Sequence, residues 1–112
     1  MQLVEIARFT DNVQQMTDFY AHLLDSEPQS RSDEMAVFLV NGVKIFIHKT
    51  YTPGVGDLPP ENHIAFRVSD LDATCHDLAV QGFQLEAAPR DYYWGRSAYL
   101  RDPDGQLVEI TQ

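Results

Sequence analysis

The sequence predicts an α+β protein in which two βαβββ modules pair and their mixed sheets curve into a cup. One observation is internal similarity, because Glu5-Ile6-Ala7 aligns with His63-Ile64-Ala65 and the element types that follow agree. A second is a stretch rich in Pro and Gly at 51–61, which is typical of a linker. We therefore expect a single domain with one module at 1–50 and the other at 62–112.

The first module is predicted to open with a strand at 2–9 and to continue with an amphipathic helix that Thr10 or Asp11 caps. The apolar stripe of this helix comprises Val13, Met16, Tyr20, Leu23 and Leu24. Three short strands are expected near 28–32, 35–40 and 43–49. Asn41-Gly42, between the last two, is a strong signal for a two-residue hairpin.

The second module repeats this order. A strand at 62–68 alternates polar and apolar residues, and Ser69 or Asp70 can cap the helix that follows. The stripe of this helix comprises Leu71, Cys75, Leu78 and Ala79. Strands are expected near 83–89, 96–101 and 106–111, with Asp102-Pro103-Asp104-Gly105 as the last turn.

Composition excludes several classes of function. A formal charge of −9 argues against nucleic acid as a partner, because phosphates require a basic surface. No apolar run is long enough for a membrane span, which takes roughly 20 residues. The N-terminus lacks the pattern of a signal peptide. The single cysteine, Cys75, cannot form an intrachain disulfide, which suits the reducing cytoplasm. We expect a cytoplasmic protein with no membrane partner.

Strand alternation predicts which side chains lie on the face that no helix covers. In 106–111, Val108 and Ile110 face the helix, so Glu109 faces the other way. The same alternation gives the helix-free face four residues of the metal-ligand types: Glu5, His48, His63 and Glu109. A sheet that curves around this face would bring them together.

Two segments of the second module resemble the vicinal oxygen chelate (VOC) superfamily, which comprises glyoxalases, bleomycin resistance proteins and dioxygenases. They are His63-Ile64-Ala65-Phe66-Arg67-Val68-Ser69-Asp70-Leu71 and Tyr99-Leu100-Arg101-Asp102-Pro103-Asp104-Gly105-Gln106-Leu107-Val108-Glu109-Ile110. In the first module, Thr17-Asp18-Phe19-Tyr20 looks like the family's helix segment. The resemblance covers almost the whole chain and implies the VOC fold.

The resemblance also implies a metal site. Ligands in metal-binding members come from the first and last strands of the modules, and these positions fall on His63, Glu109 and Glu5. The family usually has His or Gln where this chain has Glu5. The fourth position falls on Phe46, which cannot ligate, as in members with three protein ligands. His48 could replace it only with a shift of register; otherwise it is a histidine at the pocket rim.

One imidazole and two carboxylates favour Mn²⁺, Fe²⁺ or Mg²⁺, and Zn²⁺ or Ni²⁺ are also compatible with this set. If Glu5 is not a ligand, it is positioned to be the catalytic general base, or else it is a solvent-exposed strand residue. The alternative for His63 and Glu109 is a hydrogen-bonded pair without metal.

The segment before the strand at 96–101 concentrates aromatic residues and arginines. Its Tyr93 and Trp94 suit the wall of a ligand pocket, and they suit a dimer interface equally. Arg67 and Arg96 pair either with an anionic substrate or with the surplus acidic residues. The predicted pocket residues are therefore Phe46, His48, Arg67, Tyr93, Trp94 and Arg96.

Two functions follow from these observations. The first is a divalent-metal-dependent enzyme, namely a lyase, isomerase, dioxygenase or transferase, that acts on a small substrate with adjacent oxygens. The second is a metal-free binding protein of the bleomycin-resistance type, in which acidity and aromatic residues hold a cationic, planar drug. Relatives commonly dimerise, so the resemblance implies a homodimer.

Overall fold

The computed structural model describes residues 1–55, 57–58 and 60–112, which form two compact units. One unit comprises residues 5–62, and the other comprises residues 1–4 together with 63–112. The predicted linker at 51–61 includes Gly56 and Pro59, which lie outside the described residues. No helix in the described part of the chain is both long and apolar enough to cross a membrane.

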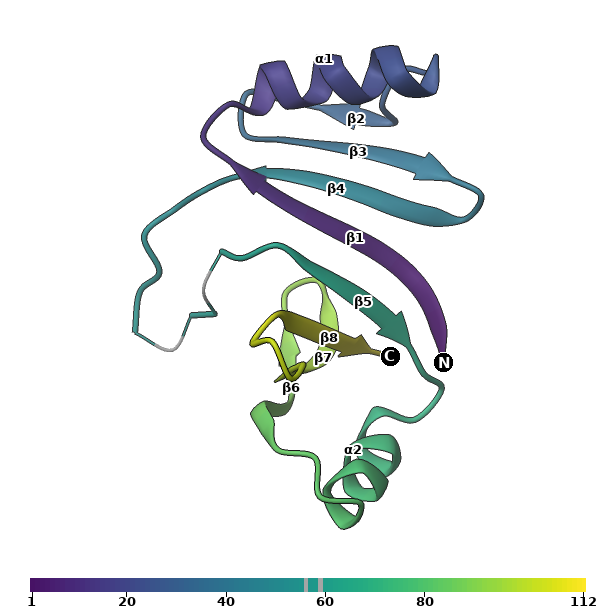
Figure 1. The fold of residues 1–112 in the computed structure, drawn as a ribbon, viewed down its shortest axis with the longest axis vertical. Coiled ribbons are helices and arrows are strands. Elements are labelled where there is room, and N and C mark those ends of the chain that lie inside the picture. Colours follow the sequence, from purple (N-terminus) through teal and green to yellow (C-terminus); the bar gives the residue numbers. More distant parts are fainter. Residues whose placement is uncertain (56, 59) are drawn as a thin grey trace. The chain divides into compact units, whose positions relative to one another are not determined.

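The first module has the predicted order βαβββ (Figure 1, purple to teal). Its elements are β1 (Gln2–Thr10), α1 (Val13–Leu24), β2 (Ser30–Arg31), β3 (Met35–Val40) and β4 (Val43–Lys49). The strand order is β2-β3-β4-β1, in which β4 runs parallel to β1 and antiparallel to β3. Asn41 and Gly42 both have positive φ, of 50° and 83°. A two-residue hairpin of this type requires such values at both central residues.

The core of this module lies between α1 and its sheet. Val13, Ala36, Phe38 and Ile47 are buried, and most of the predicted helix stripe packs against them. Leu23 was wrongly predicted to join the stripe, because its side chain is 66% exposed. The predicted cap was also wrong: α1 begins after Asn12, which makes no side-chain cap bond. Thr10 Oγ1 instead accepts a hydrogen bond from the Asn12 N–H.

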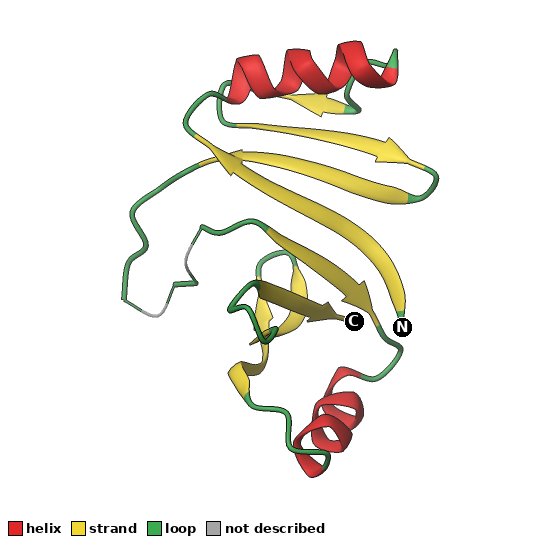
Figure 2. Cartoon of the chain, viewed as in Figure 1, coloured by secondary structure: helices red, strands yellow, loops and turns green. Residues whose placement is uncertain are grey.

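The second module repeats the βαβββ order. Figure 2 shows its helix in red and its strands in yellow. Its elements are β5 (His63–Arg67), α2 (Leu71–Val80), β6 (Leu85–Tyr92), β7 (Gly95–Arg101) and β8 (Leu107–Thr111). The strand order is β5-β8-β7-β6, with β5 and β8 parallel. Asp70 caps α2 as predicted, because its carboxylate accepts a hydrogen bond from the Ala73 N–H at 3.0 Å. The predicted α+β class is confirmed.

The helix-covered face of this sheet carries the second core. Leu71, Cys75, Ala98, Leu100 and Ile110 are buried together, and Val108 packs against them. Ala79 is exposed, so its predicted place in the helix stripe was wrong. Because neighbouring side chains on a strand alternate between faces, the residues between these core positions point away from α2. That helix-free face holds the candidate site.

Candidate metal site

A histidine and a glutamate lie close together on the helix-free face of the second module. His63 is the first residue of β5, and Glu109 lies in the middle of the adjacent parallel strand β8. His63 Nε2 is 3.7 Å from Glu109 Oε2, and the two side chains are only 11% and 6% exposed. The structure therefore brings together two of the three metal ligands that the sequence predicts.

Hydroxyl groups from β7 fix the orientation of the Glu109 carboxylate. Its Oε1 accepts hydrogen bonds from Ser97 Oγ at 3.0 Å and from Tyr99 OH at 2.9 Å. Oε2 is the oxygen that lies toward His63. One oxygen is thus held by protein hydroxyl groups, and the other lies beside the imidazole.

Sequence reasoning missed the roles of Ser97 and Tyr99. Tyr99 begins the segment that resembles the VOC superfamily, but that segment was used only to assign Glu109, and Ser97 lies before it. The signal was nevertheless present in strand alternation. Tyr99 is the antiparallel register partner of Glu109, and Ser97 is the partner of Thr111. Cross-strand partners share a face, so any side chain opposite Glu109 on β7 points to the same space.

Burial and hydrogen bonding act in opposite directions on the Glu109 carboxyl. Burial raises its pKa, because a charge is poorly solvated there. The neighbouring His63 ring and the Tyr99 and Ser97 hydroxyls lower it by more, so the pKa of Glu109 lies below its usual value. The group is therefore a carboxylate at neutral pH, and a buried carboxylate favours a positively charged neighbour.

This pKa depression predicts a pH-dependent contribution to stability. A carboxyl whose folded-state pKa is depressed stabilises the fold above its unfolded pKa, which is about 4.3 for Glu. The contribution is lost as the pH falls through the lower folded-state pKa of Glu109. We expect the free energy of unfolding of wild type, minus that of Glu109→Gln, to fall as the pH drops below about 4.5. Urea denaturation at a series of pH values measures this difference. A difference that stays the same as the pH falls from about 5 to about 3 would contradict the lowered pKa of Glu109.

The pair has the geometry and chemistry of a divalent metal site. The two atoms, 3.7 Å apart, are too distant for a direct hydrogen bond. Two donors about 2.1 Å from one metal lie about 3.2–3.7 Å apart when the angle between them at the metal is about 100–125°. Ligating carboxylates are commonly held by further hydrogen bonds, as Glu109 is by Ser97 and Tyr99. The residues present therefore fit a metal ion.

Glu5, the third predicted ligand, lies on β1 in the first module. Its register partner on β4 is Lys44. Because side chains alternate along β1, Glu5 lies on the same face of that strand as Ala7 and Phe9. Its role as a ligand or as a general base remains a prediction.

Phe46 and His48 belong to an aromatic cluster in the first module. The His48 ring lies 5.6 Å from the Phe46 ring, 5.8 Å from Phe9 and 6.0 Å from Tyr51, measured between ring centroids. His48 Nδ1 is also 2.7 Å from the main-chain oxygen of Lys49. This contact orients the ring. Whether the cluster lines a ligand pocket remains a prediction.

The two predicted arginines differ in their surroundings. Arg96 donates to Asp72 of α2 at 2.8 and 3.0 Å and to Asp91 at 3.1 Å. It therefore lies on the helix side of β7, away from Glu109, and of its two predicted roles the structure favours pairing with acidic residues. Arg67 is exposed at the end of β5, on the same face as His63 by alternation.

An aromatic stack extends from the Glu109 network to the surface. Trp94 lies parallel to Tyr92 with ring centroids 4.4 Å apart, and Tyr93 packs edge-on against Trp94 at 4.8 Å. Tyr92 in turn packs edge-on against Tyr99, the residue that bonds Glu109. Tyr93 itself is 98% exposed. Trp94 is therefore connected to the candidate site through Tyr92.

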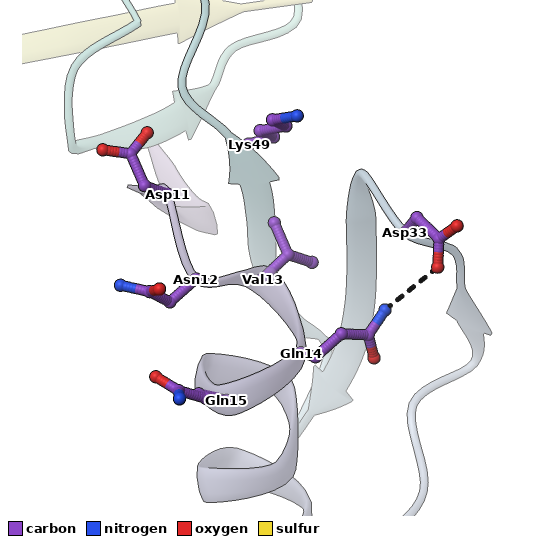
Figure 3. A pocket seen from close by; sticks show the side chains of 7 residues that line it. All are labelled: Asp11, Asn12, Val13, Gln14, Gln15, Asp33 and Lys49. Carbon is purple, nitrogen blue, oxygen red and sulfur yellow. Dashed lines mark hydrogen bonds between the residues drawn. The ribbon is translucent and has the colours of Figure 1, made fainter.

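A separate hollow in the first module lies at the beginning of α1 (Figure 3). Gln14 Nε2 donates to Asp33 Oδ1 across it at 3.3 Å. The residues that line it are Asp11, Asn12, Val13, Gln14, Gln15, Asp33 and Lys49. None of the predicted site residues is among them, so this hollow is distinct from the His63–Glu109 pair.

Two βαβββ modules with metal-ligand residues on a helix-free sheet face define a class of α+β proteins built by repetition of one module. The family model described as Glyoxalase/Bleomycin resistance protein/Dioxygenase superfamily matches residues 2–110. The chain therefore belongs to this superfamily, as the resemblance in the sequence implied.

Individual relatives agree with this membership. The chain is 35% identical over 71 residues to a protein of Vibrio cholerae named "Probable lactoylglutathione lyase", a match covering 59% of this chain and 51% of that one. It is 29% identical over 124 residues to YraH of Bacillus subtilis, covering 98% and 97%. The chain thus matches about half the length of the Vibrio relative and nearly all of YraH.

Solved structures show the same fold. Methylmalonyl-CoA epimerase of Streptomyces coelicolor superposes with a TM-score of 0.69 at 20% identity, covering 98% of this chain and 92% of that one. At this identity the likeness concerns the fold and not the activity. It confirms the predicted VOC architecture.

Proposed function

We propose that this protein is a divalent-metal-dependent enzyme that acts on a small substrate with two adjacent oxygens. The supporting observation is the Glu109 carboxylate, which is buried, ionised and hydrogen-bonded through one oxygen while the other faces His63. A free surface glutamate needs no such arrangement, whereas a metal ligand does. The reaction class is a lyase, isomerase, dioxygenase or transferase.

In this proposal, His63, Glu109 and Glu5 hold the metal. The set suits Mn²⁺, Fe²⁺ or Mg²⁺, and Zn²⁺ or Ni²⁺ remain compatible with its imidazole. The bound ion would supply Lewis-acid stabilisation of negative charge on the substrate oxygens.

The protein groups have separate tasks. Ser97 and Tyr99 hold one oxygen of Glu109, so that the other keeps a constant direction. A carboxylate at Glu5, if it is not a ligand, would accept a proton from the substrate carbon beside the polarised oxygen. The low exposure of His63 and Glu109 excludes bulk water from their side of the reacting atoms.

The second candidate is a metal-free binding protein. The observation that favours it is the aromatic stack, because Trp94 is 49% exposed and Tyr93 is 98% exposed next to it. Such surfaces suit a planar ligand, and a formal charge of −9 suits a cationic one. In this case the His63–Glu109 pair would serve only the fold.

Elemental analysis separates the two functions. Protein is purified without chelator, and samples are incubated with Mn²⁺, Zn²⁺ or Ni²⁺ and then dialysed. The metal-dependent function predicts about one ion per chain under at least one condition. Protein that retains no metal under any condition would contradict this function and leave the binding protein.

We further propose that two copies associate, and that the protein works in the cytoplasm. Exposed apolar side chains favour association, because two chains that pair can bury them. On α1, the side chains of Phe19 and Leu23 are 59% and 66% exposed. Sedimentation equilibrium at micromolar concentration is expected to give twice the chain mass of 12.7 kDa. A mass of one chain under these conditions would show that the dimer prediction is wrong.

A further inference from the structure

Tyr92, the last residue of β6, has a hydroxyl group that the metal site does not use. Its oxygen is buried. Among the buried side-chain nitrogen and oxygen atoms of the described residues, it alone has no hydrogen-bond partner. Buried polar groups are nearly always paired, because an unpaired one loses the hydrogen bonds that water would give it. Such an exception calls for a physical explanation.

The ring that carries this hydroxyl is firmly held. Trp94 stacks on it with centroids 4.4 Å apart and planes inclined by 13°, and the Arg90 guanidinium carbon lies 4.3 Å above its centroid. Both groups lie against the plane of the ring. Tyr99 packs against its edge with centroids 6.0 Å apart. The hydroxyl therefore cannot turn toward another protein group without loss of these contacts.

Tyr92 lies on the sheet face that carries the candidate site. Arg90 is the register partner of Ser97, so this face of β6 is continuous with the face of β7 that bonds Glu109. Burial raises the pKa of the Tyr92 phenol, and the Glu109 charge raises it further, while Arg90 opposes both. The phenol is therefore protonated at neutral pH and can donate.

We propose that Tyr92 donates its hydroxyl hydrogen to an oxygen of the substrate that binds beside His63 and Glu109. This inference rests on the proposed function and specifies the substrate further. Besides its adjacent oxygens, the substrate has a planar unsaturated or aromatic part that lies on the exposed surface of Trp94. Tyr92 thereby selects an acceptor oxygen, and Trp94 selects the planar group attached to it.

The first test compares the stabilities of three tyrosine-to-phenylalanine variants. Tyr92→Phe removes an unpaired hydroxyl and keeps the stacked ring, so its melting temperature should equal or exceed that of wild type. Tyr99→Phe removes a paired hydroxyl and should melt lower. Tyr20→Phe, on α1 of the other module, is the matched control. A lower melting temperature for Tyr92→Phe would overturn the proposal, because the hydroxyl would then have a structural partner such as a fixed water.

The second test measures binding of acetohydroxamate and benzohydroxamate to Zn²⁺-loaded protein by calorimetry. Both probes present two adjacent oxygens, and only the second carries an aromatic ring. Tyr92→Phe should bind both at least about tenfold more weakly, with unchanged uptake of Zn²⁺. Trp94→Leu should lose the preference for benzohydroxamate, and Tyr20→Phe should match wild type.

The outcomes of this test separate the two proposals. If wild type takes up Zn²⁺ but Tyr92→Phe binds the hydroxamates as tightly as wild type, the role of Tyr92 is overturned and the metal site stands. If wild type takes up no metal, the proposed function fails and the role of Tyr92 fails with it. A normal affinity for acetohydroxamate in Tyr92→Phe, with a loss only for benzohydroxamate, would also overturn the hydrogen bond.

Discussion

Replacement of His63 by alanine is expected to weaken metal binding by at least about 100-fold, because even loss of a supporting contact to a ligand commonly costs about 10–100-fold. His63 supplies the imidazole of the site, and its Nε2 lies 3.7 Å from the second oxygen of Glu109. Neither Ser97 nor Tyr99 can replace it, since both donate to the first oxygen. Calorimetric titration of chelator-treated protein with Zn²⁺ measures the change.

His76→Ala is the matched control for this titration. His76 lies exposed on α2 in the same module, and it belongs to neither the pair nor the aromatic stack. It should bind Zn²⁺ as wild type does. Equal affinities for His63→Ala and His76→Ala would show that any bound ion lies elsewhere.

Replacement of Glu109 by alanine is expected to lower the free energy of unfolding by about 2–4 kcal/mol, the usual range when a buried network loses its acceptor. The Ser97 and Tyr99 hydroxyls would both lose their bond to the carboxylate. The removed side chain would also leave a cavity beside His63. Urea denaturation of metal-free protein at pH 7 measures this loss.

Glu109→Gln separates the structural role of this residue from its role as a ligand. The amide oxygen still accepts from Ser97 and Tyr99, so metal-free stability should change by less than about 1 kcal/mol. The negative charge is lost, however, and Zn²⁺ binding should weaken as strongly as in His63→Ala. A glutamine variant that binds Zn²⁺ like wild type would contradict the ligand assignment.

The sequence was sufficient to predict the His63–Glu109 pair, because both residues lie in strands whose alternation is unambiguous. A period of two assigns each to the helix-free face, and the resemblance to the VOC superfamily implied that both belong to one site. The Asn41-Gly42 hairpin and the Asp70 cap were predictable for a similar reason, since each is a local motif with its own backbone requirement.

Other features depend on tertiary structure that no local pattern encodes. Leu23 has helical spacing, yet the sheet beneath α1 covers a narrower part of the helix than the stripe predicts. The sequence left two roles open for Arg96, pairing with an anionic substrate or with surplus acidic residues, and only the position of β7 shows that it meets Asp72. The unpaired hydroxyl of Tyr92 is visible only once its neighbours are positioned.

The location of a bound metal tests the central claim most directly. Crystals of Zn²⁺-loaded protein, measured at the zinc absorption edge, give an anomalous difference map in which the ion is identified independently of the protein atoms. We expect one strong peak per chain, about 2.0–2.2 Å from His63 Nε2 and from Glu109 Oε2. A map with no peak beside this pair, or with the ion bound elsewhere on the chain, would contradict the claim.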